Sequence, residues 1–327
     1  MEREISLDRH GEGRGPAEGQ VVRGVYYLRD RIVNLYLVGD PRADVSGGGR
    51  WVLVDAGLPG VADRIVRAAE SRFGVGARPE AIVMTHGHFD HTGALKTLAE
   101  RWDVPVYAHT LELPYLTGRS KYPPPDPTVG KGSMPFFART FPRGPIDLGA
   151  RVQPLPEDGS VPGMDGWRWI FTPGHTAGHV SFFRDNDRTL IAGDAFVTTK
   201  QESAMSVLTQ RREVNGPPAY FTQDWGAARD SVRKLAELNP NVAATGHGLP
   251  MSGGDLHREL DRLARDFDRL ALPKHGRYVD QPAIADESGT VSVPPPVADP
   301  VGRIVAGVAI AAVAAALLRN RGGESRS

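Results

Sequence analysis

The sequence predicts an α/β protein in which helices pack in layers against β-sheet. The chain has 327 residues, and short apolar runs rich in β-branched residues alternate along it with longer amphipathic segments. Its 40% apolar and 24% charged residues are typical of a globular protein with a sizeable core. Its 38 Gly and 27 Pro residues predict many loops between the elements.

Short apolar runs bounded by turn residues predict the strands, because their length and β-branched content suit a buried sheet. The runs are 21–28, 32–38, 51–54, 81–85, 104–107, 167–171, 180–183, 189–192 and 242–244. Amphipathic patterns with helical spacing predict helices over 61–71, 93–102, 225–238 and 256–270.

Composition along the chain predicts one main domain with additions. We expect a loose N-terminal arm over residues 1–20, which are charged and Gly-rich, and a domain over 21–280. Within that domain, the Pro-rich stretch 112–146 is predicted to be an insertion, and 251–272 its C-terminal helix. The second Pro-rich stretch, 281–300, is predicted to be a linker.

Beyond this linker, residues 301–319 predict an apolar helix. Its central part, 304–318, reads IVAGVAIAAVAAALL and has arginines on both sides. Such a helix is about 22 Å long, less than the roughly 30 Å of a membrane's hydrocarbon core. A membrane anchor, a helix packed on the domain and a self-association element therefore all stay open, and the sequence does not determine the oligomeric state.

Several classes of function and location are disfavoured by what the chain lacks. With no cysteine, it has no disulfides, thiolate nucleophile or Cys-ligated zinc, so His and carboxylates would have to hold any metal. Equal numbers of basic and acidic residues, 39 of each, argue against nucleic-acid binding. The first residues lack the apolar run of a secretory signal, so we expect a cytoplasmic protein, which 304–318 could tether to the cytoplasmic face of a membrane.

A dense group of potential metal ligands follows the predicted strand 81–85. His86, His88, Asp90 and His91 lie within six residues, although the whole chain has only 10 His. Such density is far above a random scatter and disfavours an interpretation as solvated surface residues. The segment therefore predicts a metal site.

Three further candidates each follow another predicted strand. His175 comes after 167–171, Asp194 after 189–192 and His247 after 242–244. Ends of strands meet at one edge of an α/β sheet, so we expect these side chains to converge on the first group. Adjacent glycines would let the backbone approach a cation closely.

On these residues the chain resembles the metallo-β-lactamase-fold hydrolase superfamily, and within it the glyoxalase II-like branch. The matching motifs, in the family's order, are Asp55-Ala56-Gly57, H-x-H-x-D-H at 86–91, TPGHTAGH at 172–179, Gly193-Asp194 and Gly246-His247-Gly248. The resemblance covers about residues 20 to 250. It implies a metallo-β-lactamase-like catalytic domain, an αββα sandwich of two mixed sheets flanked by helices.

The resemblance also implies two metals joined by a shared aspartate. The implied ligands are His86, His88 and His175 for one metal, Asp90, His91 and His247 for the other, and Asp194 as the bridge. Imidazole and carboxylate ligands favour two Zn²⁺, with iron or manganese also possible. By the same resemblance, Asp90 would be catalytic, steering the nucleophile and passing on its proton.

Further residues are expected to support the ligands or to shape the substrate site. Asp55 and His179 are predicted to orient ligands rather than to bind metal. The insertion 112–146 and the segment near 220 are predicted to form a wall or lid over the metals. Its candidate aromatic residues are Tyr115, Tyr122, Phe136, Phe137, Tyr220 and Phe221.

The leading hypothesis is a dinuclear hydrolase in which a metal-bridging hydroxide attacks the carbonyl of a small ester, thioester or lactone. Its partner would be a small acyl substrate. A competing hypothesis is a mononuclear iron oxygenase of the persulfide dioxygenase type, which shares the fold. A β-lactamase is a third hypothesis, and a membrane-tethered binding module without catalysis is a fourth.

Overall fold

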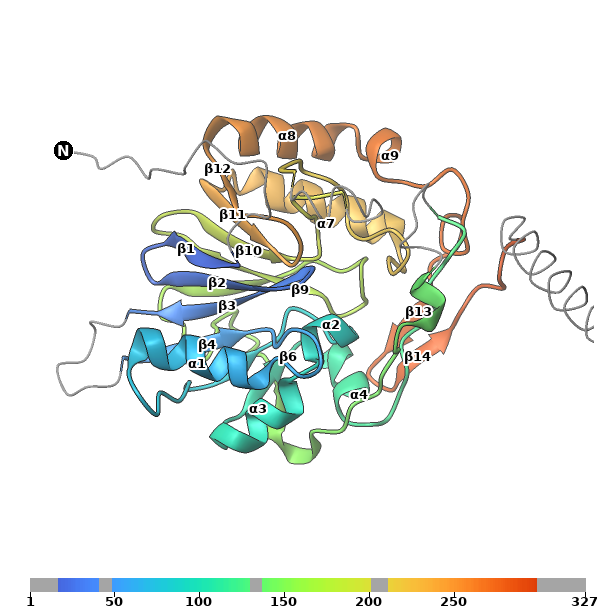
Figure 1. Ribbon diagram of the computed structural model, residues 1–327. Helices are drawn as coiled ribbons and strands as arrows, with labels where there is room; N and C mark the ends of the chain where they lie inside the picture. The colour runs from blue at the N-terminus through green and yellow to red at the C-terminus, as the bar shows by residue number, and fades with distance from the viewer. Residues whose placement is uncertain (1–16, 41–48, 130–136, 201–210, 299–327) are drawn as a thin grey trace, which may run out of the picture.

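Two mixed β-sheets lie face to face, and helices cover the outer face of each (Figure 1). The computed structural model describes residues 17–40, 49–129, 137–200 and 211–298. The predicted αββα sandwich is thereby confirmed. Phe136 and the apolar segment 304–318 lie outside the described residues.

The first sheet has seven strands that neighbour one another in chain order. They are β1 (Glu18–Val22), β2 (Val25–Asp30), β3 (Val33–Gly39), β4 (Trp51–Val54), β5 (Ile82–Val83), β6 (Val106–Ala108) and β7 (Val152–Pro154). Pairing is antiparallel from β1 to β4 and parallel from β4 to β7. Helices α1 (Ala62–Phe73) and α3 (Leu95–Trp102) bury their apolar stripes on its outer face.

The second sheet has five strands in the order β12, β11, β10, β9, β8. They are β8 (Trp167–Phe171), β9 (Val180–Arg184), β10 (Thr189–Gly193), β11 (Val242–Thr245) and β12 (Met251–Ser252). Helices α7 (Trp225–Glu237) and α8 (Gly253–Arg265) pack on its outer face. The side chain of Asp224 caps α7 by accepting a hydrogen bond from the Ala227 N–H at 2.9 Å.

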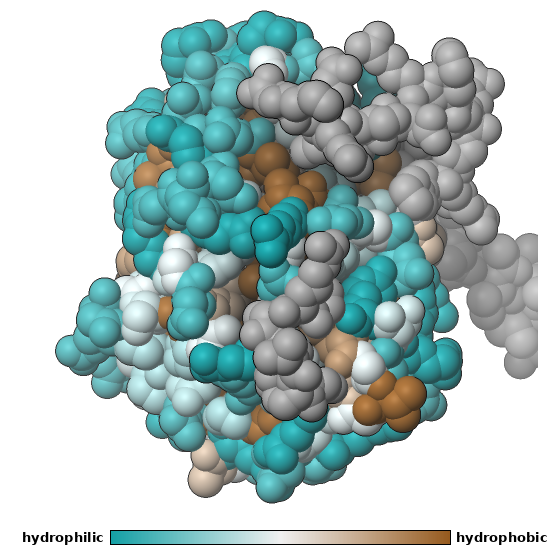
Figure 2. All heavy atoms as spheres, turned by 90° about the vertical axis from the view of Figure 1, so that its left-hand side faces the viewer, coloured by the Kyte–Doolittle hydropathy of each residue, from teal (hydrophilic) through white to brown (hydrophobic). Residues whose placement is uncertain are grey.

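A third apolar cluster fills the space between the sheets. Val54 and Val83 of the first sheet and Ile191 and Ala244 of the second are among its fully buried members. Strands buried on both faces carry continuous apolar runs instead of alternating ones, which is why these segments were recognisable in the sequence. Figure 2 shows the side of the molecule that lies at the left in Figure 1, and most of the described residues visible there are hydrophilic. Helix α2 spans Phe89–Thr92.

Some predicted element boundaries are wrong for local reasons. The run 21–28 is two strands, β1 and β2, because the chain turns at Gly24 with φ of +75°. The predicted helix 93–102 is preceded by the short α2. The predicted helix 256–270 breaks at Asp266 into α8 and α9 (Phe267–Leu270), and within 251–272 the first two residues form β12.

The stretch predicted as a linker contains an ordered β-hairpin, which corrects that prediction for its described part. Strands β13 (Ile284–Asp286) and β14 (Gly289–Ser292) pair antiparallel. The Thr290 N–H donates to Ser120 Oγ at 3.0 Å, and the Tyr278 hydroxyl donates to the Pro124 carbonyl at 2.6 Å. The hairpin and the segment before it thus pack on the insertion 112–146, a contact between distant residues that local composition does not reveal.

The described part of the insertion has little regular structure. It holds α4 (Leu113–Leu116) and the short 3-10 helix Ala138–Thr140, and 3-10 turns Thr110–Glu112 and Gly149–Arg151 lie on either side of it. Its aromatic residues Tyr115 and Tyr122 are nevertheless almost completely buried. Over the described residues, the helices are all too short or too polar to cross a membrane.

Candidate metal centre

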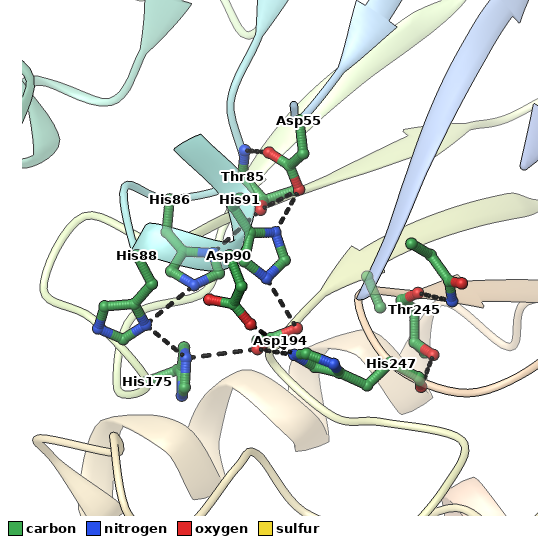
Figure 3. A network of polar contacts seen from close by, with 12 residues as sticks. Asp55, Thr85, His86, His88, Asp90, His91, His175, Asp194, Thr245 and His247 are labelled. Atoms are coloured by element: carbon green, nitrogen blue, oxygen red, sulfur yellow. Dashed lines mark hydrogen bonds and ion pairs between the residues drawn. The ribbon is translucent and has the colours of Figure 1, made fainter. Parts of the chain in front are cut away.

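Seven buried side chains converge at one edge of the sandwich (Figure 3). The loop after β5 and the helix α2 carry four of them, and the loops after β8, β10 and β11 carry one each. They are His86, His88, Asp90, His91, His175, Asp194 and His247. The structure therefore brings together all of the ligands that the sequence suggested.

Three imidazoles form the first group. The Nδ1 of His88 lies 3.1 Å from Nε2 of His86 and 3.0 Å from Nε2 of His175. The Thr85 hydroxyl donates to Asp55 at 2.8 Å, so it accepts from Nδ1 of His86, 3.0 Å away. This network assigns the proton of His86 to Nδ1 and leaves the Nε2 lone pair directed at the group.

A second hydroxyl orients His175 in the same way. Thr222 donates its proton to the Pro218 carbonyl at 2.9 Å, so its oxygen accepts from Nδ1 of His175 at 3.4 Å. The Nε2 of His175 then also presents a lone pair. Three imidazole nitrogens this close would repel one another, so a cation among them would stabilise the arrangement.

The second group combines two imidazoles with a carboxylate. Nδ1 of His91 donates to Asp55 at 2.8 Å, and Nδ1 of His247 donates to the Ile32 carbonyl at 2.6 Å. Both rings therefore direct Nε2 inward. Nε2 of His247 lies 3.5 Å from Oδ2 of Asp90, which completes the group.

Asp194 lies between the two groups. Its Oδ2 is 3.4 Å from Nε2 of His175 and 3.1 Å from Nε2 of His247, and its Oδ1 is 3.7 Å from Nε2 of His91. Oδ1 of Asp194 and Nε2 of His91 are buried, and neither has a hydrogen-bond partner among the described residues. A buried unpaired polar atom costs about 1–3 kcal/mol, so these atoms fit a bound cation. The donor set thus suits two metals sharing one carboxylate.

Burial keeps the first group uncharged. It lowers the pKa of His86 and His175 well below the usual value and that of His88 to about 3, and neighbouring imidazoles lower them further. An imidazole must be unprotonated to bind a metal. The first group is therefore ready to bind a cation at neutral pH.

Nearby carboxylates determine the pKa values of the imidazoles in the second group. Burial alone would lower the pKa of His91, but Asp55, Asp194 and Asp90 raise it well above its usual value. The pKa of His247 is raised in the same way, since burial is outweighed by Asp194. Burial would raise the pKa of Asp194, yet His247 and His91 hold it well below its usual range. This half of the centre attracts cations, and without a metal it attracts protons.

Asp55 and His179 hold the ligand residues in place through hydrogen bonds. Asp55 accepts hydrogen bonds at 2.8 Å from the Thr85 N–H, the Thr85 hydroxyl and Nδ1 of His91, so it orients His91 directly and His86 through Thr85. Nε2 of His179 accepts the Asp194 N–H at 2.9 Å. These contacts fix ring orientation and the position of Asp194.

An aromatic wall borders the first group. The rings of Tyr122 and Phe221 each lie 4.7 Å from the ring of His88. Tyr115 stacks on Tyr122 with centroids 3.9 Å apart, and Tyr220 packs on Phe221 at 5.0 Å. These two therefore back the wall.

Two further phenylalanines lie in or near the segments predicted to form the wall. Phe137, which was predicted for the wall, is 51% exposed and directly precedes the 3-10 helix Ala138–Thr140. Phe89 was not predicted for the wall, although its ring lies 5.1 Å from Phe141 and 6.3 Å from Phe221. Glu112, buried beside the ligand loops, was also missed, and its only sequence signal is an acidic residue within the apolar run LELPYL.

Comparison with known proteins agrees with this geometry. Residues 28–247 match the sequence profile described as Metallo-beta-lactamase superfamily. The chain belongs to the metallo-beta-lactamase superfamily. It is 48% identical over 257 residues to the "Probable metallo-hydrolase YflN" of Bacillus subtilis (strain 168), covering 79% of this chain and 96% of that protein.

More distant relatives are also similar. The "Hydroxyacylglutathione hydrolase GloC" of Haemophilus influenzae is 24% identical, over 43% of this chain and 59% of that one. Among solved structures, a B3 metallo-beta-lactamase described as the first with an active-site glutamic acid aligns with a TM-score of 0.50 at 17% identity, over 78% and 89% of the two chains. This superfamily member is thus a probable metallo-hydrolase.

Proposed function

We propose that this superfamily member is a dinuclear metal-dependent hydrolase acting on a small ester, thioester or lactone. The observation that carries the proposal is the arrangement of two ligand groups around one shared carboxylate, Asp194. The relative named as a probable metallo-hydrolase supports the reaction class, since it is 48% identical to this chain.

The donor set determines which metals suit the centre and what they supply. Imidazole nitrogens and carboxylate oxygens without thiolate favour Zn²⁺, with iron or manganese also possible. Two such cations would supply Lewis acidity for a carbonyl and lower the pKa of water to about 7. His86, His88 and His175 would hold one cation, and Asp90, His91 and His247 the other.

The protein's own contribution is to hold charges and move a proton. Figure 3 shows the Asp90 carboxylate between the imidazoles of the two groups. It is 7% exposed and has His247 on one side, so it is placed to orient an attacking water and accept its proton. The Asp194 N–H donates to Nε2 of His179, and this contact fixes the position of the carboxylate between the two ligand groups.

The aromatic wall suits the substrate's acyl part. Tyr122 and Phe221 present ring faces and edges next to His88 and exclude water from that side. A thioester is one candidate, supported by the similarity to a hydroxyacylglutathione hydrolase. Esters and lactones have the same carbonyl chemistry, so they are candidate substrates as well.

Metal analysis combined with a substrate panel tests this proposal. Protein purified without added metal should contain close to two equivalents of a divalent metal and hydrolyse at least one of the acyl thioesters, esters or lactones offered. Asp194→Asn, which replaces the shared carboxylate, should lower kcat/KM by about 10³-fold or more, since it weakens both ligand groups. A single tightly bound iron with oxygen uptake, and no hydrolysis, would overturn the proposal.

A further inference from the structure

Glu112 is a completely buried carboxylate that the proposed reaction does not use. It ends the 3-10 turn Thr110–Glu112 after β6, and its exposed fraction is 0%. Burying a carboxylate is costly unless hydrogen bonds replace its water. Its partners therefore indicate why it is there.

Four neutral donors from three segments surround this carboxylate. Oε1 accepts hydrogen bonds from the Thr176 hydroxyl at 2.6 Å and from the Gly178 N–H at 3.0 Å. Oε2 accepts from the Gly87 N–H at 3.0 Å and from the Tyr122 hydroxyl. The Tyr122 oxygen also accepts from the Gly87 N–H at 2.9 Å, so the tyrosine's proton is directed to Glu112.

These donors lie next to the metal-ligand residues of the first group. Gly87 stands between His86 and His88 in the chain, and Thr176 directly follows His175. The approach is close: a Cβ on Gly87 would lie 2.6 Å from the Tyr122 hydroxyl oxygen. A single carboxylate therefore ties together the two loops that carry the three imidazoles.

We propose that Glu112 is a positioning residue, whose carboxylate fixes the distance between the loop of His86 and His88 and the loop of His175 and thereby sets the affinity of this group for a cation. The inference rests on the proposed function, because it takes the three imidazoles to be metal ligands. An ionised carboxylate offers about four acceptor sites, and the four donors fill them.

An amide is a poor replacement for this carboxylate. In Glu112→Gln the NH₂ group would face one backbone N–H and one hydroxyl. The hydroxyl can turn to accept from it, but the N–H cannot, so that hydrogen bond is lost and two like dipoles oppose each other. The same argument applies to a protonated carboxyl: burial raises the pKa of Glu112, but an added proton would meet one of the four donors. The loops would then separate.

Zn²⁺ affinity of the full chain, measured by competition with a chromophoric chelator, tests the proposal without an activity assay. Glu112→Gln is expected to lower the affinity for one of the two Zn²⁺ equivalents by about 10- to 100-fold and to leave the affinity for the other nearly unchanged. Thr176→Val and Tyr122→Phe each remove one donor and keep the side-chain shape. Each should weaken the same equivalent by less than Glu112→Gln does.

Asp126→Asn is the matched control, since it alters another buried carboxylate outside the ligand loops. Asp126 is 2% exposed and accepts hydrogen bonds from the N–H groups of Thr128 and Arg277. The variant should lower the melting temperature and leave both Zn²⁺ affinities unchanged. Equal weakening in Asp126→Asn and Glu112→Gln would overturn the positioning role.

The remaining outcomes separate the two proposals. Two Zn²⁺ equivalents in the wild type with unaltered affinities in Glu112→Gln would overturn this inference alone. No binding of Zn²⁺, Fe²⁺ or Mn²⁺ by the wild type would instead overturn the proposed function. If Glu112→Gln does not fold, Thr176→Val and Tyr122→Phe decide the question, and unaltered affinities in both would count against the role.

Discussion

The two halves of the metal centre use the same kinds of ligand but differ in what stands behind them. Behind His86 and His175 are threonine hydroxyls, and burial lowers the pKa of both imidazoles. Behind His91 is the Asp55 carboxylate, and nearby carboxylates raise the pKa of His91. One half is therefore uncharged, and the other is acidic.

Because of this difference, the two halves would hold their metals for different reasons. In the neutral half, a cation meets preformed lone pairs with no protons to displace, so geometry limits affinity. In the acidic half, more negative charge attracts the cation, but protons compete for the same nitrogens.

Gly246→Ala should remove the metals from both halves, because it displaces the shared carboxylate of Asp194. A Cβ at this position would lie 2.0 Å from Oδ1 of Asp194 and 2.9 Å from Cε1 of His91. We expect the loss of both metal equivalents and of hydrolysis, measured by metal analysis and by kcat/KM. Gly226→Ala on α7 is the control: its Cβ meets only Asp224 Oδ1 at 3.4 Å, so both metals should remain. Normal metal content in Gly246→Ala would contradict the geometry of Asp194.

Asp55→Asn should weaken the acidic half selectively. Asp55 has a left-handed backbone with φ of +61°, which Asn also adopts, so the turn should survive. The amide removes the charge that holds Nδ1–H of His91, and we expect the affinity for one metal to fall by about 10- to 100-fold. Chelator competition measures this. A loss confined to the other equivalent would show that the Thr85 relay to His86 dominates.

Lowering the pH should remove the metal of the acidic half before that of the uncharged half. A raised ligand pKa means that protons compete at a higher pH, so the metal held by His91 and His247 should leave first. Its affinity should fall by about tenfold per pH unit for each proton taken up. At His88, whose pKa is about 3, competition begins only in strong acid. Dialysis in steps from about pH 8 to pH 5, with metal analysis, would show it, and simultaneous loss of both metals would argue against two distinct halves.

Phe221→Leu should have the smallest effect, on substrate binding only. Its ring lies 4.7 Å from the ring of His88 but makes no hydrogen bond to a ligand. We expect KM for an acyl substrate to rise a few-fold, corresponding to about 1 kcal/mol of lost apolar contact, with kcat and metal content nearly unchanged. Steady-state kinetics measures this. A large drop in metal content would instead place Phe221 among the residues that support His88.

The sequence was most informative where pattern and chemistry are local. Strand β4 lies where its apolar run predicted it, because a strand buried on both faces carries an unbroken run. The loop with His86, His88 and His91 was recognisable because its ligands are adjacent in the chain. Contacts between residues that are distant in the chain were not predicted. An example is the β13–β14 hairpin, which packs on residues near Ser120.

The α/β class, the candidate ligands and their order along the chain could be predicted from residue type and short-range periodicity. The lone pairs that His86, His91, His175 and His247 present, and the contacts of Asp55 with both halves of the centre, became visible only in the folded molecule. The tertiary structure alone revealed that Glu112 joins two loops, through Gly87 and Gly178. The reason is physical: hydrogen bonds and burial between distant segments arise only when the sheets pack, and no local pattern encodes their partners.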